Sequence, residues 1–94
     1  MDYSKLSDDE INNMVGHLVS QRFRTDYCND PGAAWPIISK HRISIEFDGD
    51  NSTEPPTTWC HTTSLDRTIG TQYQKNPLRA AMITFLMMQE SQHA

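Results

Sequence analysis

Two dipeptides of the same kind, Asp30-Pro31 and Asn76-Pro77, mark the positions at which two helices can begin. Asp and Asn side chains accept hydrogen bonds from the free N–H groups of a first helical turn, and Pro is favoured at the first helical position. Asp30-Pro31 therefore predicts a short helix, although Pro36 would remove one of its backbone hydrogen bonds. That helix is either short and kinked or begins only after Trp35.

The helix predicted after Asn76-Pro77 has a wide apolar face. The residues that recur at helical spacing are Leu78, Ala81, Met82, Phe85, Leu86 and Gln89, and Ile83, Met87 and Met88 widen the face. This width predicts a helix that packs on more than one side. We expect Met82 in the core and keep Met87 or Met88 as candidates for an exposed apolar patch. A polar tail, Glu90 to Ala94, follows.

An N-terminal helix from about Asp8 to Phe23 is predicted by its start signals. Ser7 and Glu10 have the spacing of a capping box, and Leu6 and Ile11 have the spacing of a hydrophobic staple. The acidic residues that open this helix complement the positive end of its dipole, so they need no catalytic explanation.

The middle of the chain predicts an antiparallel hairpin. Ile43 to Phe47 alternates between apolar and polar residues, as a half-buried strand does, and Thr57 to Thr63 is rich in β-branched and aromatic residues. Between them, Asp48 to Ser52 is a turn cluster, and Glu54-Pro55-Pro56 is incompatible with a helix or a central strand. Thr68 to Tyr73 is a weaker candidate for a third strand.

These elements predict an α+β fold, in which an N-terminal helix, a C-terminal helix and one short helix cover a small antiparallel sheet of two to three strands. A chain of 94 residues is large enough for one hydrophobic core and too small for two. We therefore expect a single domain over residues 1–94.

The charge balance disfavours direct binding to nucleic acid. Twelve acidic and eight basic residues give a net charge of −4, and the basic residues are scattered, whereas nucleic-acid binding needs a basic footprint. The longest apolar stretch, Leu78 to Met88, is interrupted by Arg79 and Thr84 and is far shorter than the roughly 20 residues that span a bilayer. We expect no membrane partner.

Cysteine and histidine residues do not form a pattern with assigned chemistry. Structural zinc sites use closely spaced ligand pairs, which Cys28, Cys60 and the four histidines do not provide. Cys60 and His61 are adjacent on a predicted strand and would point to opposite faces. We predict no metal, no cofactor and no catalytic residue, and we expect both thiols to be packed in the core, although a small Cys/His enzyme stays an alternative.

Three segments resemble the NinX-like family of small accessory proteins from tailed phages and prophages of enteric bacteria. They are Asp26 to Pro31, Ala34 to Ile38 and Asn76 to Met82, and the opening from Asp2 to Asn12 is also similar to the start of its members. The resemblance covers most of the chain apart from roughly Asp48 to Lys75. The family brings no assigned catalytic residues, and this chain is short between Phe23 and Asp26, where relatives often carry more sequence.

The resemblance and the charge together predict a non-enzymatic phage accessory protein that binds a host or phage protein in the host cytoplasm. Its most concrete form is an inhibitor of a bacterial defence system, such as a CRISPR effector or a restriction complex. The candidate partner-binding residues are Glu46, Asp48, Asp50 and Glu54, which would occupy a basic groove. The alternatives are that these carboxylates only solvate a loop, or that the protein is a nucleic-acid-associated regulator.

The unusual stretch Cys28 to Ile38 is explained best as architecture. Asp30 and Pro31 would start the helix, and Trp35, Ile37 and Ile38 would anchor it to the sheet that begins at Ile43.

Overall fold

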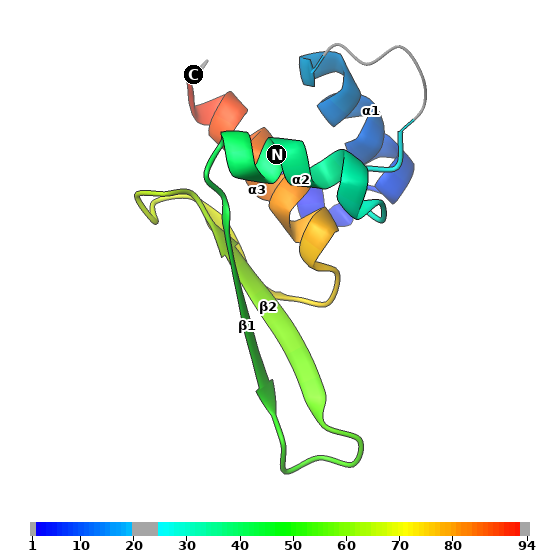
Figure 1. Ribbon diagram of the computed structural model, residues 1–94, viewed down its shortest axis with the longest axis vertical. Coiled ribbons are helices and arrows are strands. Elements are labelled where there is room, and N and C mark those ends of the chain that lie inside the picture. Colours follow the sequence, from blue (N-terminus) through cyan, green and yellow to red (C-terminus); the bar gives the residue numbers. More distant parts are fainter. Residues whose placement is uncertain (1, 20–24, 93–94) are drawn as a thin grey trace.

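The computed structural model describes residues 2–19 and 25–92 and confirms an α+β fold (Figure 1). A 3-10 turn, three helices and three strands follow in the order η1 (Tyr3–Lys5), α1 (Asp8–Val19), α2 (Pro31–Lys40), β1 (Ser44–Asp50), β2 (Thr57–Thr63), β3 (Gly70–Gln74) and α3 (Pro77–Gln92). The part of the predicted first helix from residue 20 to Phe23 lies outside the described residues. The predicted polar tail is helical as far as Gln92.

The start of each helix follows the predicted capping. The Ser7 hydroxyl accepts from the Glu10 amide at 3.1 Å, and the Ser7 amide donates to the Glu10 carboxylate at 3.2 Å. The Asp30 carboxylate accepts from the Gly32 amide at 3.0 Å. Because α2 begins at Pro31 and continues through Pro36, the alternative start after Trp35 is wrong.

Helix α3 forms the centre of the fold. Its residues from Ala80 to Leu86 are all buried, and it contacts α1, α2 and each strand of the sheet. This confirms a helix packed on more than one side, with Met82 in the core. Met87 and Met88 are half-buried against the same core, so the expectation of an exposed patch there is wrong.

The sheet has the strand order β1-β2-β3, with both pairs antiparallel. Strand β1 is longer than predicted: Asp48 to Asp50, expected as a turn, pair with Trp59 to Thr57 and continue the strand. The backbone hydrogen bonds to the partner strand outweigh here the local preference of Asp and Gly for turns.

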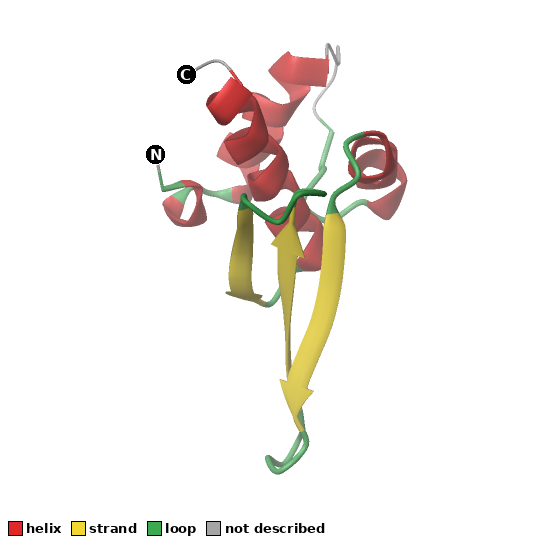
Figure 2. Cartoon of the chain, turned by 90° about the vertical axis from the view of Figure 1, so that its left-hand side faces the viewer, coloured by secondary structure: helices red, strands yellow, loops and turns green. Residues whose placement is uncertain are grey.

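The hairpin of β1 and β2 projects away from the helices, which gather at the other end of the molecule (Figures 1 and 2). The overall extents are 44 × 28 × 24 Å. Near the helices, Cys60 and Thr62 are buried, whereas every residue from Glu46 to Thr58 is exposed. Helices therefore cover only the proximal part of the sheet.

A buried threonine pair joins the sheet to α3. The Thr62 hydroxyl lies 2.7 Å from the Thr84 hydroxyl and donates to the Ala80 carbonyl at 3.1 Å. It also lies 2.6 Å from the Thr71 hydroxyl on β3. These contacts satisfy polar groups that would otherwise be costly to bury.

The expectation that Trp35 anchors α2 to the sheet is wrong. Trp35 is 62% exposed, whereas Ala34, Ile37 and Ile38 are buried. Residues three and four positions apart share a helix face, so Ala34, Ile37 and Ile38 form one face and Trp35 lies beside it. That buried face packs mainly against α3 rather than against the sheet.

Candidate functional site

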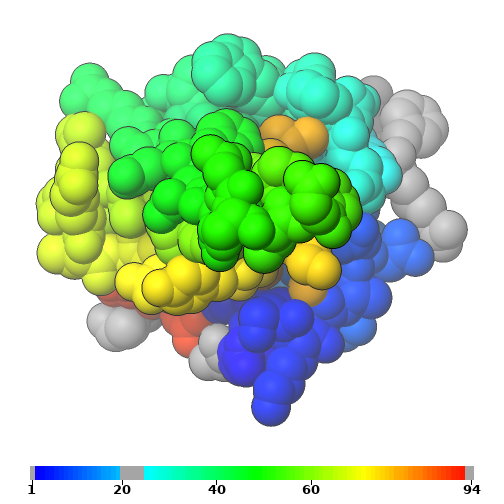
Figure 3. Space-filling view, turned by 90° about the horizontal axis from the view of Figure 1, so that it is seen from below, coloured from blue at the N-terminus to red at the C-terminus, as the bar shows by residue number. Residues whose placement is uncertain are grey.

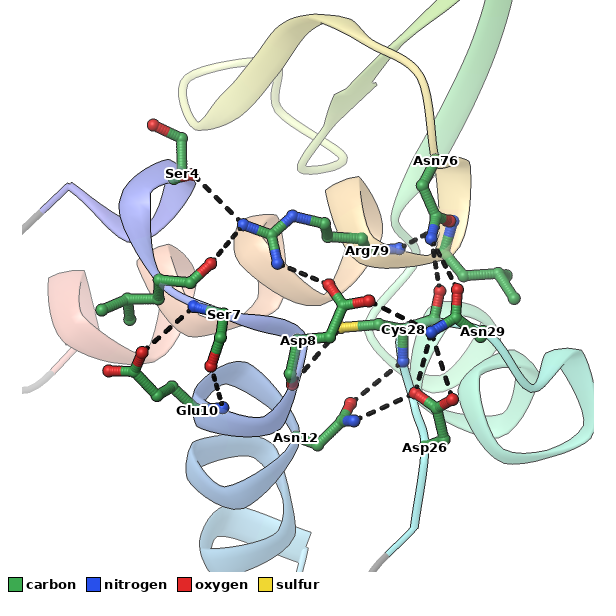
Figure 4. A network of polar contacts seen from close by, with 12 residues as sticks. Ser4, Ser7, Asp8, Glu10, Asn12, Asp26, Cys28, Asn29, Asn76 and Arg79 are labelled. Carbon is green, nitrogen blue, oxygen red and sulfur yellow. Dashed lines mark hydrogen bonds and ion pairs between the residues drawn. The ribbon is translucent and has the colours of Figure 1, made fainter.

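Three of the four segments that carry the predicted family resemblance meet in one polar network, and Ala34 to Ile38 has no side chain in it (Figure 4). We call it the Asp8–Arg79 network, and its side chains are those of Asp8, Asn12, Asp26, Asn29, Asn76 and Arg79. The Asn12 amide group donates to Asp26 at 3.0 Å, and its carbonyl accepts from the Cys28 backbone at 3.1 Å. Asn29 donates to Asp26 and, at 3.2 Å, to Asp8.

Two residues complete the network: Asn76, which precedes α3, and Arg79 in the first turn of α3. Asn76 donates to the Cys28 carbonyl at 2.8 Å and to the Asn29 side chain at 3.0 Å, while its own carbonyl oxygen caps α3. Arg79 donates to the Asp8 carboxylate at 2.6 Å. Hydrogen bonds from Asn29 and Arg79 hold the pKa of Asp8 below its ordinary value. These groups bond chiefly to one another. The network therefore joins three parts of the fold, which are α1, the loop that precedes α2, and the start of α3.

The predicted partner-binding carboxylates lie on the projecting hairpin. Glu46, Asp48 and Asp50 alternate along β1, so their side chains share one face of the strand. We call these three residues the acidic row. Glu54 is exposed in the connection between β1 and β2, beyond the strand end, so the structure brings three of the four together and leaves the fourth apart.

The acidic row is exposed, and two of its carboxylates accept local hydrogen bonds. Asp48 accepts from the Gly49 amide at 2.8 Å, and Asp50 accepts from the Ser52 amide and hydroxyl at 2.8 and 2.6 Å. These bonds from Ser52 lower the pKa of Asp50. In the part of the chain that the structure describes, no Lys or Arg forms an ion pair with the acidic row or with Glu54.

Aromatic residues on the same face of the sheet escaped the sequence prediction. Trp59 pairs with Asp48, and His61 pairs with Glu46 across the hairpin. Tyr73 on β3 lies with its ring 5.0 Å from that of His61 and 6.0 Å from that of Trp59, between centroids. The sequence does contain a signal for the positions of Trp59 and His61, because they alternate along the strand with Cys60 and Thr62, which are buried. No local signal predicts the position of Tyr73.

A comparison with protein families gives a match over residues 16–89 to the family described as bacteriophage P22 NinX. The chain belongs to this NinX family. No curated protein and no solved structure matches the chain. The match confirms the predicted resemblance and makes this NinX protein a phage accessory protein. It covers the hairpin, three of the four segments of the resemblance and nearly all of α3, whereas the opening from Asp2 to Asn12 lies outside it.

Neither thiol of this NinX protein is placed as a nucleophile. Cys28 is fully buried, and its burial, together with the negative charge of Asp8, raises its pKa to about 12. Cys60 is 1% exposed, and burial raises its pKa as well. Cysteine reactivity requires thiolate, which burial disfavours on both residues.

The described residues contain neither a cluster of metal ligands nor a membrane-spanning helix. Across residues 2–19 and 25–92, no three His, Cys, Asp or Glu side chains stand close enough to hold a metal ion. Within the same ranges, no helix combines the length and apolar character that crossing a membrane requires.

Proposed function

We propose that this NinX-family protein acts without catalysis, by presenting the acidic row to a basic surface of a host or phage protein in the host cytoplasm. The observation that supports the proposal is a projecting strand that carries Glu46, Asp48 and Asp50 on one exposed face with no cation paired to them among the described residues. Uncompensated charge on a protruding element costs little in water and attracts a partner of opposite charge.

The spacing of the charges indicates what kind of partner suits the hairpin. Alternate residues of a strand are about 7 Å apart, so the acidic row carries about half the linear charge density of one DNA strand. A protein surface that binds nucleic acid has the opposite charge and the width to accept a strand. We therefore propose that the hairpin occupies a nucleic-acid-binding groove of a bacterial defence complex, such as a CRISPR effector or a restriction complex.

The two buried thiols favour binding over catalysis in this proposal. Their raised pKa values deprive a Cys/His enzyme of its nucleophile, and the acidic row would repel the phosphates of a nucleic acid.

A capture experiment with matched variants tests the proposal. The wild type, the double variant Glu46→Gln with Asp48→Asn, and the control Asp9→Lys are immobilised and exposed to lysate of an enteric host. Asp9 is exposed on α1, and Asp9→Lys changes the net charge by the same amount as the double variant.

The expected result is a protein that the wild type and Asp9→Lys retain and the double variant loses. The purified captured protein should then release its DNA or RNA as wild-type protein is added, less so at high salt. Equal retention by all three proteins, or nucleic-acid binding that the wild type leaves unchanged, would contradict the proposal.

A further inference from the structure

The face of the sheet turned away from α3 combines aromatic rings with the acidic row. We define the aromatic face as Trp59, His61 and Tyr73. We propose that the aromatic face, together with Glu46 and Asp48, binds an arginine side chain of the partner protein. The inference rests on the proposed function, because it names the chemical group by which the partner is recognised at the same hairpin.

A bulge in β3 holds Tyr73 in its position. Cys60 pairs with Gln74 and Thr62 pairs with Thr71, so Gln72 and Tyr73 together stand opposite His61. The backbone amide of Tyr73 donates to the His61 ring nitrogen Nδ1 at 3.1 Å instead of to a strand carbonyl. Bulges redirect side chains and are frequent beside functional sites.

The backbone of Tyr73 is strained, and its ring is not buried in return. Its φ is +57°, a conformation that bulky residues rarely adopt. The side chain is nevertheless 69% exposed. Strained residues persist where the surrounding structure holds them and gather at binding sites. Core packing therefore does not explain the positive φ of Tyr73, whereas a role of the Tyr73 ring in contacting a ligand does.

The aromatic face lies on the side of the sheet that α3 does not cover, where Tyr73 is exposed and Trp59 and His61 are half-buried. Cys60 and Thr62 turn toward α3, so Trp59 and His61, which alternate with them, turn away from it. Figure 3, seen from the hairpin tip, shows the hairpin nearest the viewer, with β3 beside it in yellow. Because Glu46 pairs with His61 and Asp48 pairs with Trp59, a partner that docks on the face turned away from α3 contacts both the rings and the acidic row.

The chemistry of this surface matches a guanidinium group. Directly paired residues of a hairpin have their Cβ atoms about 5 Å apart, which places Glu46 beside His61 and Asp48 beside Trp59. A cation binds a Trp or Tyr face when it lies within about 6 Å of the ring centroid. Arginine is planar, stacks on aromatic rings and donates two parallel hydrogen bonds to a carboxylate, which lysine cannot do.

Two synthetic peptides of equal length and charge, one of alternating arginine and glycine and one of alternating lysine and glycine, serve as probes. The chain has two tryptophans, so a Trp35→Phe background leaves Trp59 as the sole reporter of fluorescence. We expect the arginine peptide to change Trp59 emission and to bind at least tenfold more tightly than the lysine peptide.

Tyr73→Gly is the decisive variant. Glycine adopts positive φ without strain, so this variant should keep the fold and the thermal stability of the wild type while its affinity for the arginine peptide falls at least fivefold. Tyr73→Phe should bind as the wild type does. Leu65→Ala, which removes another exposed apolar side chain, is the control and should also bind normally.

The outcomes separate this inference from the proposed function. Equal binding of both peptides, dependent on Glu46 and Asp48 but unchanged in Tyr73→Gly, would overturn the arginine inference and leave the acidic row as the binding element. Absence of binding by either peptide would also overturn the inference, while the capture experiment decides the proposed function by itself. Tight, ring-dependent binding of the arginine peptide supports the inference even if the captured partner is no defence complex.

Discussion

The Arg79 guanidinium lies 2.6 Å from the Asp8 carboxylate, although 71 residues separate the two in the sequence. The same side chain donates to the backbone carbonyls of Ser4 and Leu6 at 3.1 and 2.6 Å. One arginine of α3 therefore holds both the beginning of α1 and the segment that precedes it.

Arg79→Met should lower the free energy of unfolding by about 2 to 3 kcal/mol, because it leaves two carbonyl groups and a carboxylate without their charged donor. Asp8→Asn should cost about 1 kcal/mol or less, since the Asp8 side chain is 43% exposed and exposed ion pairs contribute little. Urea unfolding followed by circular dichroism measures both. Equal losses would show that the contacts with Ser4 and Leu6 contribute nothing.

The buried pair Thr62 and Thr84 allows a double-mutant test. Thr84→Val should cost about 1 to 3 kcal/mol, because a buried hydroxyl loses its partner. Thr62→Val should cost at least as much, since the Thr62 hydroxyl also contacts the Ala80 carbonyl and Thr71. The double variant should cost less than the sum, and strict additivity of the unfolding free energies would show that the two hydroxyls are not coupled.

Trp35→Ala should cost less than about 1 kcal/mol, as substitutions at exposed positions usually do. Ile38→Ala, three residues later on the buried face of α2, should cost about 2 to 5 kcal/mol. Thermal unfolding of the two variants beside the wild type gives the comparison. A large loss for Trp35→Ala would mean that its ring is packed.

Both cysteines should resist alkylation in the folded protein at pH 8. Burial raises the pKa of each thiol, that of Cys28 to about 12, so little thiolate forms and access is closed. Mass spectrometry after iodoacetamide treatment should show modification only once urea is added. Rapid labelling of Cys28 in the native protein would contradict this and revive the enzyme hypothesis.

The alkaline limit of stability should depend on Tyr3. The Tyr3 hydroxyl donates to Glu90 at 2.6 Å. Burial is the main cause, and this hydrogen bond the second, that raises the pKa of Tyr3 to about 12. A tyrosine in the unfolded chain has a pKa of about 10. The stability that Tyr3 contributes is therefore complete below that pH and is lost as the pH rises through about 12. Tyr3→Phe should therefore lose less stability than the wild type between pH 8 and 11.

Urea unfolding at the two pH values measures this difference, with Tyr73→Phe as a control that removes an exposed tyrosine. Identical losses in Tyr3→Phe and the wild type would contradict the role of Tyr3.

The starts of the helices were predictable because caps are local. Ser7, Asp30 and Asn76 each act on an amide two or three residues ahead, so the sequence contains the whole interaction. The shared strand face of Glu46, Asp48 and Asp50 was not predicted, because the strand was expected to end at Phe47 and Asp48 to Ser52 were expected as a turn.

What could not be predicted depends on neighbours distant in the sequence. The burial of Ile38 and the exposure of Trp35 depend on which side of α2 meets α3. The position of Tyr73 depends on a bulge opposite His61, and the exposure of the hairpin depends on how far α3 extends over the sheet. The network from Asp8 to Arg79 links residues that only the fold brings together.

The hairpin leaves and re-enters the body of the protein at adjacent points, since Ser44 pairs with Thr63 and Glu46 pairs with His61. Everything between Glu46 and His61 could therefore be exchanged, shortened or extended without moving the ends that connect to the helices. Because strand side chains alternate with a period of two, additions of two residues per strand would preserve which side each residue faces. The helices and the proximal sheet thus form a framework whose hairpin can vary in length and side chains independently, and under the proposed function such variation would change which partner is bound.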